Sequence, residues 1–240
     1  MILHLSIVSH GQGELVKYLL ADLNKLSLPQ DVTLAITVTL NIDEDEGFLS
    51  VSDRCLNIIR NEFPRGFGAN HNQAFEAIPS DYFFVINPDV RLHKNFNLLF
   101  WLDLSKQNDF ACASPVIVSP NGEVEDNARK FPTVASLINR RLRGQISDAY
   151  EKSNKAQLVD WVAGIFMVFD SEKFAGISGF DEKYFMYLED TDICRRLHHA
   201  KYAVWYVGNE WLVHDARRLS RNTIKYAYWH VCSMIRFLRS

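Results

Sequence analysis

Apolar runs alternate with segments of helical spacing along the first hundred residues of the chain. Residues 2–9 form a short run rich in Ile, Leu and Val, and residues 31–40 place apolar side chains on alternate positions, as in a strand with one buried face. Between them, leucines recur at the spacing of a helix: Leu15, Leu19, Leu20, Leu23 and Leu26. Further strands are predicted over 55–61 and 81–90, with a helix over 70–78 between them. This alternation favours a mostly parallel sheet with helices on both faces.

The second half of the chain is less regular. The pattern predicts a helix over 95–106, a strand from Phe110 that ends in a turn at Asn121-Gly122, strands over 160–169 and 203–214, and a C-terminal helix. Residues 133–158 are polar without clear periodicity and are expected to form a loop. The chain has no internal repeat, and its 240 residues fit one large domain.

Composition is typical of a folded protein without a nucleic-acid partner. Apolar residues make up 48% of the chain, and the formal net charge of −3 gives no support for nucleic-acid binding. The four cysteines contain no CxxC pair, so neither a zinc site nor a disulfide framework is indicated. The N-terminus lacks the features of a signal peptide, and no apolar run approaches the roughly 18 residues of a membrane span. A cytoplasmic location is therefore expected.

Polar residues follow each predicted strand of the first half. Ser9, Asn41, Arg60 and Asp89 stand at or just after the four strand ends. Each of them alone is better explained as part of a turn, because Asn, Asp and Gly are common turn residues. In an open α/β sheet, however, ligands bind beyond the carboxyl ends of the strands. Their joint position therefore favours a common binding site.

Asn87-Pro88-Asp89 is the sharpest of these strand ends. A carboxylate directly after a buried strand projects into the crevice, where a divalent cation could bridge it to a phosphate, so Asp89 is a candidate metal ligand. The alternative is that Asn87-Pro88 merely ends the strand. His214 follows another apolar run; it is either structural or, if a metal sits at Asp89, a second ligand.

A glycine-containing turn precedes the predicted helix over 70–78. Gly66 and Gly68 allow a close backbone approach, and Asn70 lies at the start of a helix whose free N–H groups suit an anion. The spacing is neither GxGxxG nor a P-loop, so the turn alone is a weak signal for phosphate binding.

Three carboxylates, Glu189, Asp190 and Asp192, crowd around a predicted helix start after an aromatic run. Acidic residues in the first turn favour a helix by about 0.3–1 kcal/mol each, which explains one or two of them. Aromatic neighbours would shield a carboxylate from water and raise its pKa toward that of a general base. From this segment alone, a catalytic site and a helix cap are equally good explanations of the cluster.

Together these segments resemble the inverting glycosyltransferases of family 2, particularly their bacterial rhamnosyltransferase-like branch. The matching pieces span roughly residues 2–220 and include "SIVSHGQGELV", "NEFPRGFGANHNQAF", "FFVINPDV" and "VHDARRLS". The most specific piece runs from Trp161 to Tyr202. It contains a Trp-x-x-Gly strand, a Gly-Phe-Asp-Glu turn and a Glu-Asp-x-Asp helix start in that order.

The resemblance implies a GT-A fold: an α/β domain with a single Rossmann-like, doubly wound mixed sheet flanked by helices, over residues 1–220. It implies that Asp89 ends the family's metal-binding DxD motif, here Asn-Pro-Asp, and holds Mg²⁺ or Mn²⁺ on the diphosphate. His214 would complete the metal or diphosphate site, and Asp190 stands at the base position beside Glu189.

The resemblance also implies two sets of binding residues. The nucleotide-sugar donor would be bound by Ser9, Asn41, Arg60, Gly66, Gly68, Asn70, Asn87 and Asp89. The acceptor would be bound by Trp161, Gly164 and Tyr187. Many relatives carry an aspartate where Asn41 stands, so the nucleotide, dTDP or UDP, is left open.

The implied activity is inverting, metal-dependent transfer of a sugar, such as rhamnose or another deoxyhexose, from a nucleotide-diphosphate donor. The acceptor would be a hydroxyl of a lipid-linked oligosaccharide or polysaccharide in cell-surface glycan synthesis. The alternative is a catalytically silent protein of the same fold that binds a sugar nucleotide or a glycan. A nucleotidyltransferase is disfavoured because no basic residue closely follows the first strand. The presence of Asp89, Asp190 and His214 favours the enzyme.

The C-terminal segment, residues 221–240, predicts a basic amphipathic helix. After Asp215 the chain has no acidic residue but carries Arg217, Arg218, Arg221, Lys225, Arg236 and Arg239. Apolar residues recur every three or four positions at Ile224, Tyr228, Val231, Ile235 and Leu238. Such a helix either lies on an anionic membrane surface or packs on the domain.

Overall fold

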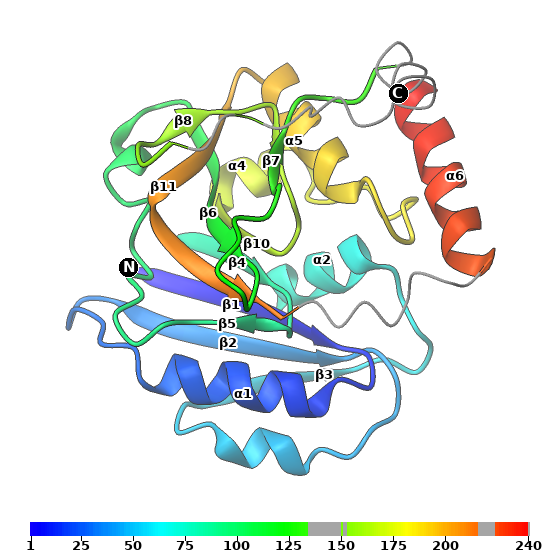
Figure 1. Cartoon of the computed structure of the whole chain (residues 1–240). Coiled ribbons are helices and arrows are strands. Elements are labelled where there is room, and N and C mark those ends of the chain that lie inside the picture. The colour runs from blue at the N-terminus through cyan, green and yellow to red at the C-terminus, as the bar shows by residue number, and fades with distance from the viewer. Residues whose placement is uncertain (134–149, 151–152, 216–223, 240) are drawn as a thin grey trace.

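The computed structural model describes residues 1–133, 150, 153–215 and 224–239 (Figure 1). Most of the loop predicted over 133–158 lies outside the described residues. Arg217, Arg218 and Arg221 of the basic C-terminal segment lie outside them as well.

Four parallel strands form the first half of the main sheet. In spatial order they are β3 (Leu56–Arg60), β2 (Thr33–Leu40), β1 (Ile2–Ser9) and β4 (Tyr82–Ile86). The connecting helices α1 (Gly13–Asn24) and α2 (Phe67–Ala77) cover opposite faces of this half (Figure 1). The leucines of α1 pack on Leu3, Leu5 and Ile7 of β1 in one buried cluster. The predicted alternation of strands and helices is confirmed here.

The second half adds strands of both directions, so the sheet is mixed. Strand β10 (Phe166–Asp170) lies antiparallel between β4 and β6 (Phe110–Val118), and β11 (Ala203–His214) runs parallel to β6. Two short strands, β5 (Val90–Arg91) and β8 (Gln157–Leu158), pair antiparallel with β11. Strands β7 (Ala128–Arg129) and β9 (Trp161–Val162) form a separate small sheet. A second apolar cluster lies between the main sheet and the helices α4 (Ser171–Gly176) and α5 (Glu189–His199).

The helix predicted over 95–106 is wrong. The chain there runs through turns, and only the short 3-10 helix η2 (Leu104–Lys106) forms; another, η1 (Gly47–Val51), follows β2. Asn97 explains the difference: its side chain accepts the Leu99 N–H at 3.0 Å, and its own N–H donates to Glu210 at 2.8 Å. A local side-chain hydrogen bond of this kind competes with the helical backbone pattern.

The strand predicted over 160–169 is broken into β9 and β10 at residues 163–165. Gly164 sits at the break, where a Cβ atom would lie 3.1 Å from the Phe67 ring. Helix α4, which follows β10, was not predicted. Asp170 caps it by accepting the Lys173 N–H at 3.0 Å.

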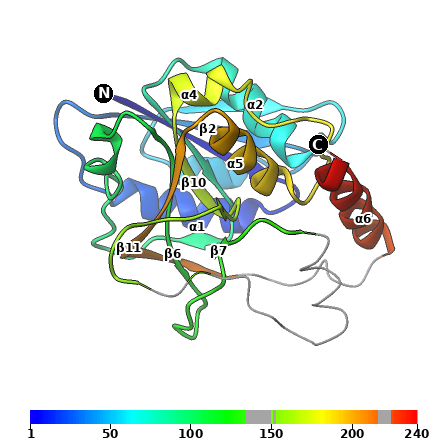
Figure 2. The same cartoon turned by 90° about the horizontal axis from the view of Figure 1, so that it is seen from above.

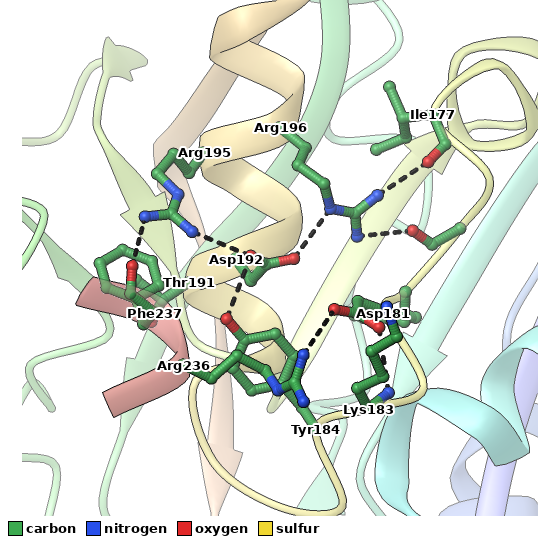
Figure 3. A network of polar contacts seen from close by, with 12 residues as sticks. Ile177, Asp181, Lys183, Tyr184, Thr191, Asp192, Arg195, Arg196, Arg236 and Phe237 are labelled. Carbon is green, nitrogen blue, oxygen red and sulfur yellow. Dashed lines mark hydrogen bonds and ion pairs between the residues drawn. The ribbon is translucent and has the colours of Figure 1, made fainter. Parts of the chain in front are cut away.

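Asp192 is the centre of a polar network in the second half (Figure 3). It is 3% exposed, and its carboxylate accepts hydrogen bonds from Arg195 at 3.1 Å and Arg196 at 2.8 Å. The Tyr184 hydroxyl donates to the same carboxylate at 3.3 Å. Arg196 also donates to two backbone oxygens of the loop before Tyr184. Besides its place in the first turn, Asp192 therefore ties α5 to the loop that leads into it.

Arg195 extends this network to the C-terminal helix α6 (Ile224–Arg239). Its guanidinium donates to the Phe237 backbone oxygen at 2.7 Å and lies 3.8 Å from the centroid of the Phe237 ring (Figure 3). Further along α6, Ser233 Oγ donates to the backbone oxygen of Met186 at 2.9 Å. One face of α6 is thus packed on the domain.

In the part of the chain that the structure describes, no helix combines the length and apolar character needed to cross a bilayer.

We expect Asp192→Ala to lower the free energy of unfolding by about 3 kcal/mol, because it leaves two largely buried guanidinium groups without their carboxylate. Chemical denaturation monitored by circular dichroism measures this change. Asp103→Ala is the matched control: Asp103 also pairs with a basic residue three positions on, but its side chain is 93% exposed. An equal loss of stability in both variants would contradict the role given to Asp192.

Candidate active site

Buried polar side chains lie at the carboxyl ends of β1 and β2, and the one on β1 bonds to the loop that follows β2. Ser9 Oγ donates to Glu44 at 2.9 Å and accepts the Gln12 N–H at 3.2 Å. Glu44 also accepts the Gly11 N–H at 3.2 Å, so it closes the turn after β1. Sequence analysis did not single out Glu44; its position in an acidic stretch after β2 was the only signal.

A chain of side-chain amides holds the loop between β3 and α2. The Asn41 carbonyl oxygen accepts from Asn61 at 2.9 Å and from the Arg65 N–H at 2.8 Å. Asn61 also donates to Asn70 at 2.6 Å, and Asn70 donates to the Gly66 backbone oxygen at 3.0 Å. Both Asn41 and Asn70 are buried. These predicted donor-binding side chains are therefore engaged in shaping the edge of the sheet.

Gly66 and Gly68 allow a close approach, but to the protein's own chain. A Cβ atom on Gly66 would lie 2.7 Å from the Phe185 backbone oxygen, and one on Gly68 would lie 2.6 Å from Phe180. The Phe67 N–H donates to the same Phe185 oxygen at 3.0 Å. The two glycines thus dock α2 against the loop 180–188 that leads into α5.

Asp89 lies next to His214 because β5 pairs with the end of β11. Val90 is the register partner of His214, and the Asp215 N–H donates to the Asp89 backbone oxygen at 2.9 Å. His214 Nε2 lies 3.3 Å from Asp89 Oδ2, and Nδ1 lies 2.8 Å from Glu125 Oε2. The predicted pair is thus brought together, with Glu125 as a third member that sequence analysis missed.

The two carboxylates decide the charge of His214. Burial of the ring opposes protonation, but hydrogen bonds and charges from Asp89 and Glu125 outweigh it and raise the pKa of His214 to about 8. The ring is therefore an imidazolium at neutral pH. Ligating a cation through Nε2 would require it to release that proton first.

The chemistry of Asp89 fits a divalent cation. Its Oδ1 atom is buried and has no hydrogen-bond partner among the described residues, while Oδ2 faces His214. An orphaned carboxylate oxygen is an unsatisfied acceptor of the kind that Mg²⁺ and Mn²⁺ prefer. No group of three His, Cys, Asp or Glu side chains suited to a metal occurs within the described residues. A cation here would thus rest on Asp89 together with the ligand's own oxygens.

Glu189 and Asp190 open α5 beside the break between β9 and β10. Asp190 Oδ2 accepts the Gly164 N–H at 3.0 Å, and Oδ1 accepts the Thr191 N–H at 2.7 Å. Before them, Tyr187 and Leu188 both have left-handed backbone angles, with φ of 72° and 66°. Such conformations cost free energy in non-glycine residues and persist only where the surroundings hold them. The turn aims Asp190 at the backbone of Gly164.

Burial raises the pKa of both carboxyl groups. For Asp190, desolvation raises the pKa, and the hydrogen bonds from Gly164 and Thr191 work against it. For Glu189, burial and then the negative charge of Asp190 raise the pKa to about 8. Glu189 Oε2 has no hydrogen-bond partner in the described part of the chain. At neutral pH Glu189 therefore holds a proton.

The two halves of the site meet across the β4–β10 pair. The Asn87 N–H, at the end of β4, donates to the Ile165 backbone oxygen at 2.9 Å, directly before β10. Asp89 follows Asn87 by two residues. Gly164, whose N–H donates to Asp190, directly precedes Ile165. The candidate metal ligand and the candidate base thus flank one backbone hydrogen bond.

The remaining predicted binding residues contact other parts of the protein. Trp161, in β9, donates its indole N–H to the Lys130 backbone oxygen at 3.0 Å. The Tyr187 ring lies 5.5 Å from His230 of α6. Arg60 is exposed at the end of the edge strand β3 and forms a two-pronged pair with Glu46, both bonds 2.6 Å long. Their predicted binding roles stay predictions.

Comparison with known proteins gives consistent matches. A family model described as the N-terminal domain of galactosyltransferase matches residues 145–229. The rhamnosyltransferase WbbL of Escherichia coli is 28% identical over 99% of this chain and 92% of its own length. The N-acetylglucosaminyl-diphospho-decaprenol L-rhamnosyltransferase of Mycobacterium tuberculosis is 30% identical over 71% of this chain. The match spans 59% of that relative's length.

Solved structures of other proteins have a similar fold. GalNAc-T7 with UDP, GalNAc and Mn²⁺ superposes with a TM-score of 0.69 at 14% identity, covering 90% of this chain and 44% of the other. The mannosyltransferase PcManGT of Pyrobaculum calidifontis, with GDP-Man and Mn²⁺, has a TM-score of 0.65 at 13% identity, covering 99% and 64%.

The fold and the comparisons together define a glycosyltransferase with the GT-A fold. Within that class, the chain is a homologue of the bacterial rhamnosyltransferases. The resemblance and the fold class inferred from the sequence are both confirmed.

The raised pKa of Glu189 predicts how stability changes with pH. The folded protein binds this proton more tightly than the unfolded chain, so the free energy of unfolding falls as pH rises from 4.5 toward 8. Glu189→Gln removes this dependence. We therefore expect the free energy of unfolding of Glu189→Gln, relative to that of wild type, to rise by up to about 1.4 kcal/mol per pH unit across that window. Denaturant unfolding at several pH values measures it. Glu172→Gln, at an exposed position of α4, is the control, and its stability should change with pH as that of wild type does. The same pH dependence in Glu189→Gln and wild type would contradict the assignment.

Proposed function

We propose that this protein transfers a sugar, such as rhamnose or another deoxyhexose, from a nucleotide-diphosphate donor to an acceptor hydroxyl with inversion at the anomeric carbon. The observation that carries the proposal is the flanking of the Asn87–Ile165 hydrogen bond by Asp89 and by the Gly164–Asp190 contact. A base and a carboxylate that could bind a cation, both fixed at one end of the β4–β10 pair, suit a displacement in one step.

Asp190 acts as the base in this reaction. The acceptor hydroxyl gives its proton to the Asp190 carboxylate as its oxygen bonds to the anomeric carbon. The bond from that carbon to the diphosphate oxygen breaks, and its electron pair leaves with the nucleoside diphosphate. The Gly164 and Thr191 N–H groups hold the carboxylate in place, while its burial keeps its affinity for a proton high.

Asp89 serves the departing diphosphate. Its orphaned Oδ1 would hold Mg²⁺ or Mn²⁺, which supplies positive charge to the leaving group when bound. The His214 imidazolium, with Nε2 3.3 Å from Asp89 Oδ2, adds a further positive charge near the diphosphate. Buried neutral amides and backbone N–H groups at the ends of β1 and β2 shape the place for the nucleotide.

The names of similar proteins support the substrate classes. Two relatives are named as rhamnosyltransferases, and the mycobacterial one is named for an acceptor linked to a diphospho-decaprenol lipid. Structural neighbours were solved with UDP-GlcNAc, or with GDP-Man and Mn²⁺. We therefore propose a dTDP- or UDP-sugar as donor and a lipid-linked oligosaccharide or polysaccharide as acceptor, in cell-surface glycan synthesis.

We expect Asp190→Asn to reduce sugar transfer by about 10²- to 10⁴-fold, because the amide cannot take the proton. The assay follows release of nucleoside diphosphate from a panel of dTDP- and UDP-sugars, with membrane lipid extract as the acceptor source. Wild-type turnover should rise with pH through the raised pKa of Asp190, since only the carboxylate is active. Glu172→Gln controls for a lost surface carboxylate. Full turnover in Asp190→Asn, or no turnover of any donor by wild type, would refute the mechanism.

Metal dependence is tested separately. EDTA should abolish turnover, and Mg²⁺ or Mn²⁺ should restore it. Asp89→Asn should require a higher metal concentration for the same rate, because the amide oxygen is a weaker ligand than a carboxylate. Asp103→Asn is the control, because the Asp103 side chain is 93% exposed. Undiminished turnover after EDTA treatment would rule out the cation.

A further inference from the structure

The outer face of α6 is apolar although it is exposed. Tyr228, Val231, Ile235 and Leu238 are 65%, 57%, 45% and 41% exposed. They recur at intervals of three or four residues, so they form one stripe along the helix. In both views, α6 stands at the edge of the molecule (Figures 1 and 2). We call these four residues the outer stripe.

The opposite face of α6 already accounts for its packing on the domain. Ser233 and Phe237 are buried there, held by Met186 and Arg195. The outer stripe is therefore additional apolar surface that packing on the domain does not require. Contiguous exposed apolar surface of this kind marks an interaction site.

A hollow of about 540 Å³ lies beside the stripe, between α6 and the loop before α5. Its lining includes three basic residues, Lys183, Arg236 and Arg239, and the aromatic residues Tyr228 and Trp229. One acidic residue lies nearby: Asp181 Oδ2 is 3.9 Å from Arg236 Nη1. Basic groups beside aromatic side chains are typical of surfaces that contact the lipid headgroup region.

We infer that the outer stripe and the adjoining basic hollow dock on an anionic lipid surface. The stripe enters the boundary between headgroups and acyl chains, and the hollow receives a lipid phosphate. The sequence agrees with this occupant, because no acidic residue follows Asp215 and six basic residues do. An apolar stripe without this charge would fit a second protein copy equally well; the charge favours the anionic membrane.

This docking would place the loop before α5 at the membrane. The loop before α5 is clamped between α2 and α6: Gly66 and Phe67 contact Phe185 on one side, and the Trp229 ring lies 4.6 Å from the Phe185 ring on the other. The same loop ends at Glu189 and Asp190. A lipid-linked acceptor would thus meet the base close to the bilayer. This last step rests on the proposed function, whereas the docking itself does not.

Flotation with vesicles tests the docking without any catalysis. The full chain is mixed with vesicles of phosphatidylcholine alone, or of phosphatidylcholine with phosphatidylglycerol. We expect binding only to the anionic vesicles, weakened by added salt. Val231→Asp and Ile235→Asp should each lower the partition constant by about tenfold or more, because an apolar side chain leaves the bilayer interface. Arg239→Gln should lower it by about fivefold.

Leu158→Asp is the matched control, since Leu158 is an apolar residue of β8 that is 55% exposed and lies away from α6. Its binding should equal that of wild type. Absence of binding to anionic vesicles, or equal loss in Leu158→Asp and Ile235→Asp, would overturn the inference. So would a dimer in sedimentation without lipid that Ile235→Asp dissociates, since the stripe would then bind a second copy. Asp190→Asn should bind vesicles like wild type, so loss of turnover and loss of docking are separable.

Discussion

The antiparallel pairing of β10 with β4 is the constraint on which the site depends. If β10 ran parallel to β4, the end of β10 rather than its beginning would lie beside the end of β4. Because β10 runs the other way, its beginning lies beside the end of β4, and Asn87 bonds directly to Ile165. This register brings the strand end at Asp89 and the helix start at Asp190 to one edge, although a hundred residues separate them along the chain.

The polar residues at strand ends could be predicted because periodicity locates strands and parallel strands end at one edge. That reasoning singled out Ser9 and Asn41, at the carboxyl ends of β1 and β2, and Asp89, shortly after β4. It could not show that Ser9 and Asn41 are engaged in internal bonds, since a single sequence does not reveal which polar atoms are partnered. Glu125 escaped notice for a related reason: it comes from an irregular loop after β6, far from His214 in sequence.

Tertiary contacts add to or override the local sequence pattern at several positions. The buried segment after Leu92 has apolar residues at helical spacing, yet Asn97 directs its backbone toward Glu210 and into turns. Gly66 and Gly68 were interpreted as places for an anion, while the space beside them is filled by the loop that carries the base. Asp192 was interpreted from its position in the first turn, and only the fold shows the arginines gathered around it.

The chain of amides through Asn41, Asn61 and Asn70 has a consequence of its own. These groups carry no net charge and do not titrate, so the hydrogen bonds that shape the donor side keep their strength across changes of pH and ionic strength. The acceptor side is built differently, from ionised or ionisable groups at Glu189, Asp190 and Asp192. A change of pH would therefore leave this amide chain unaltered and act on the ionisable groups, which are Glu189 and Asp190 on the acceptor side and His214 beside Asp89 on the diphosphate side.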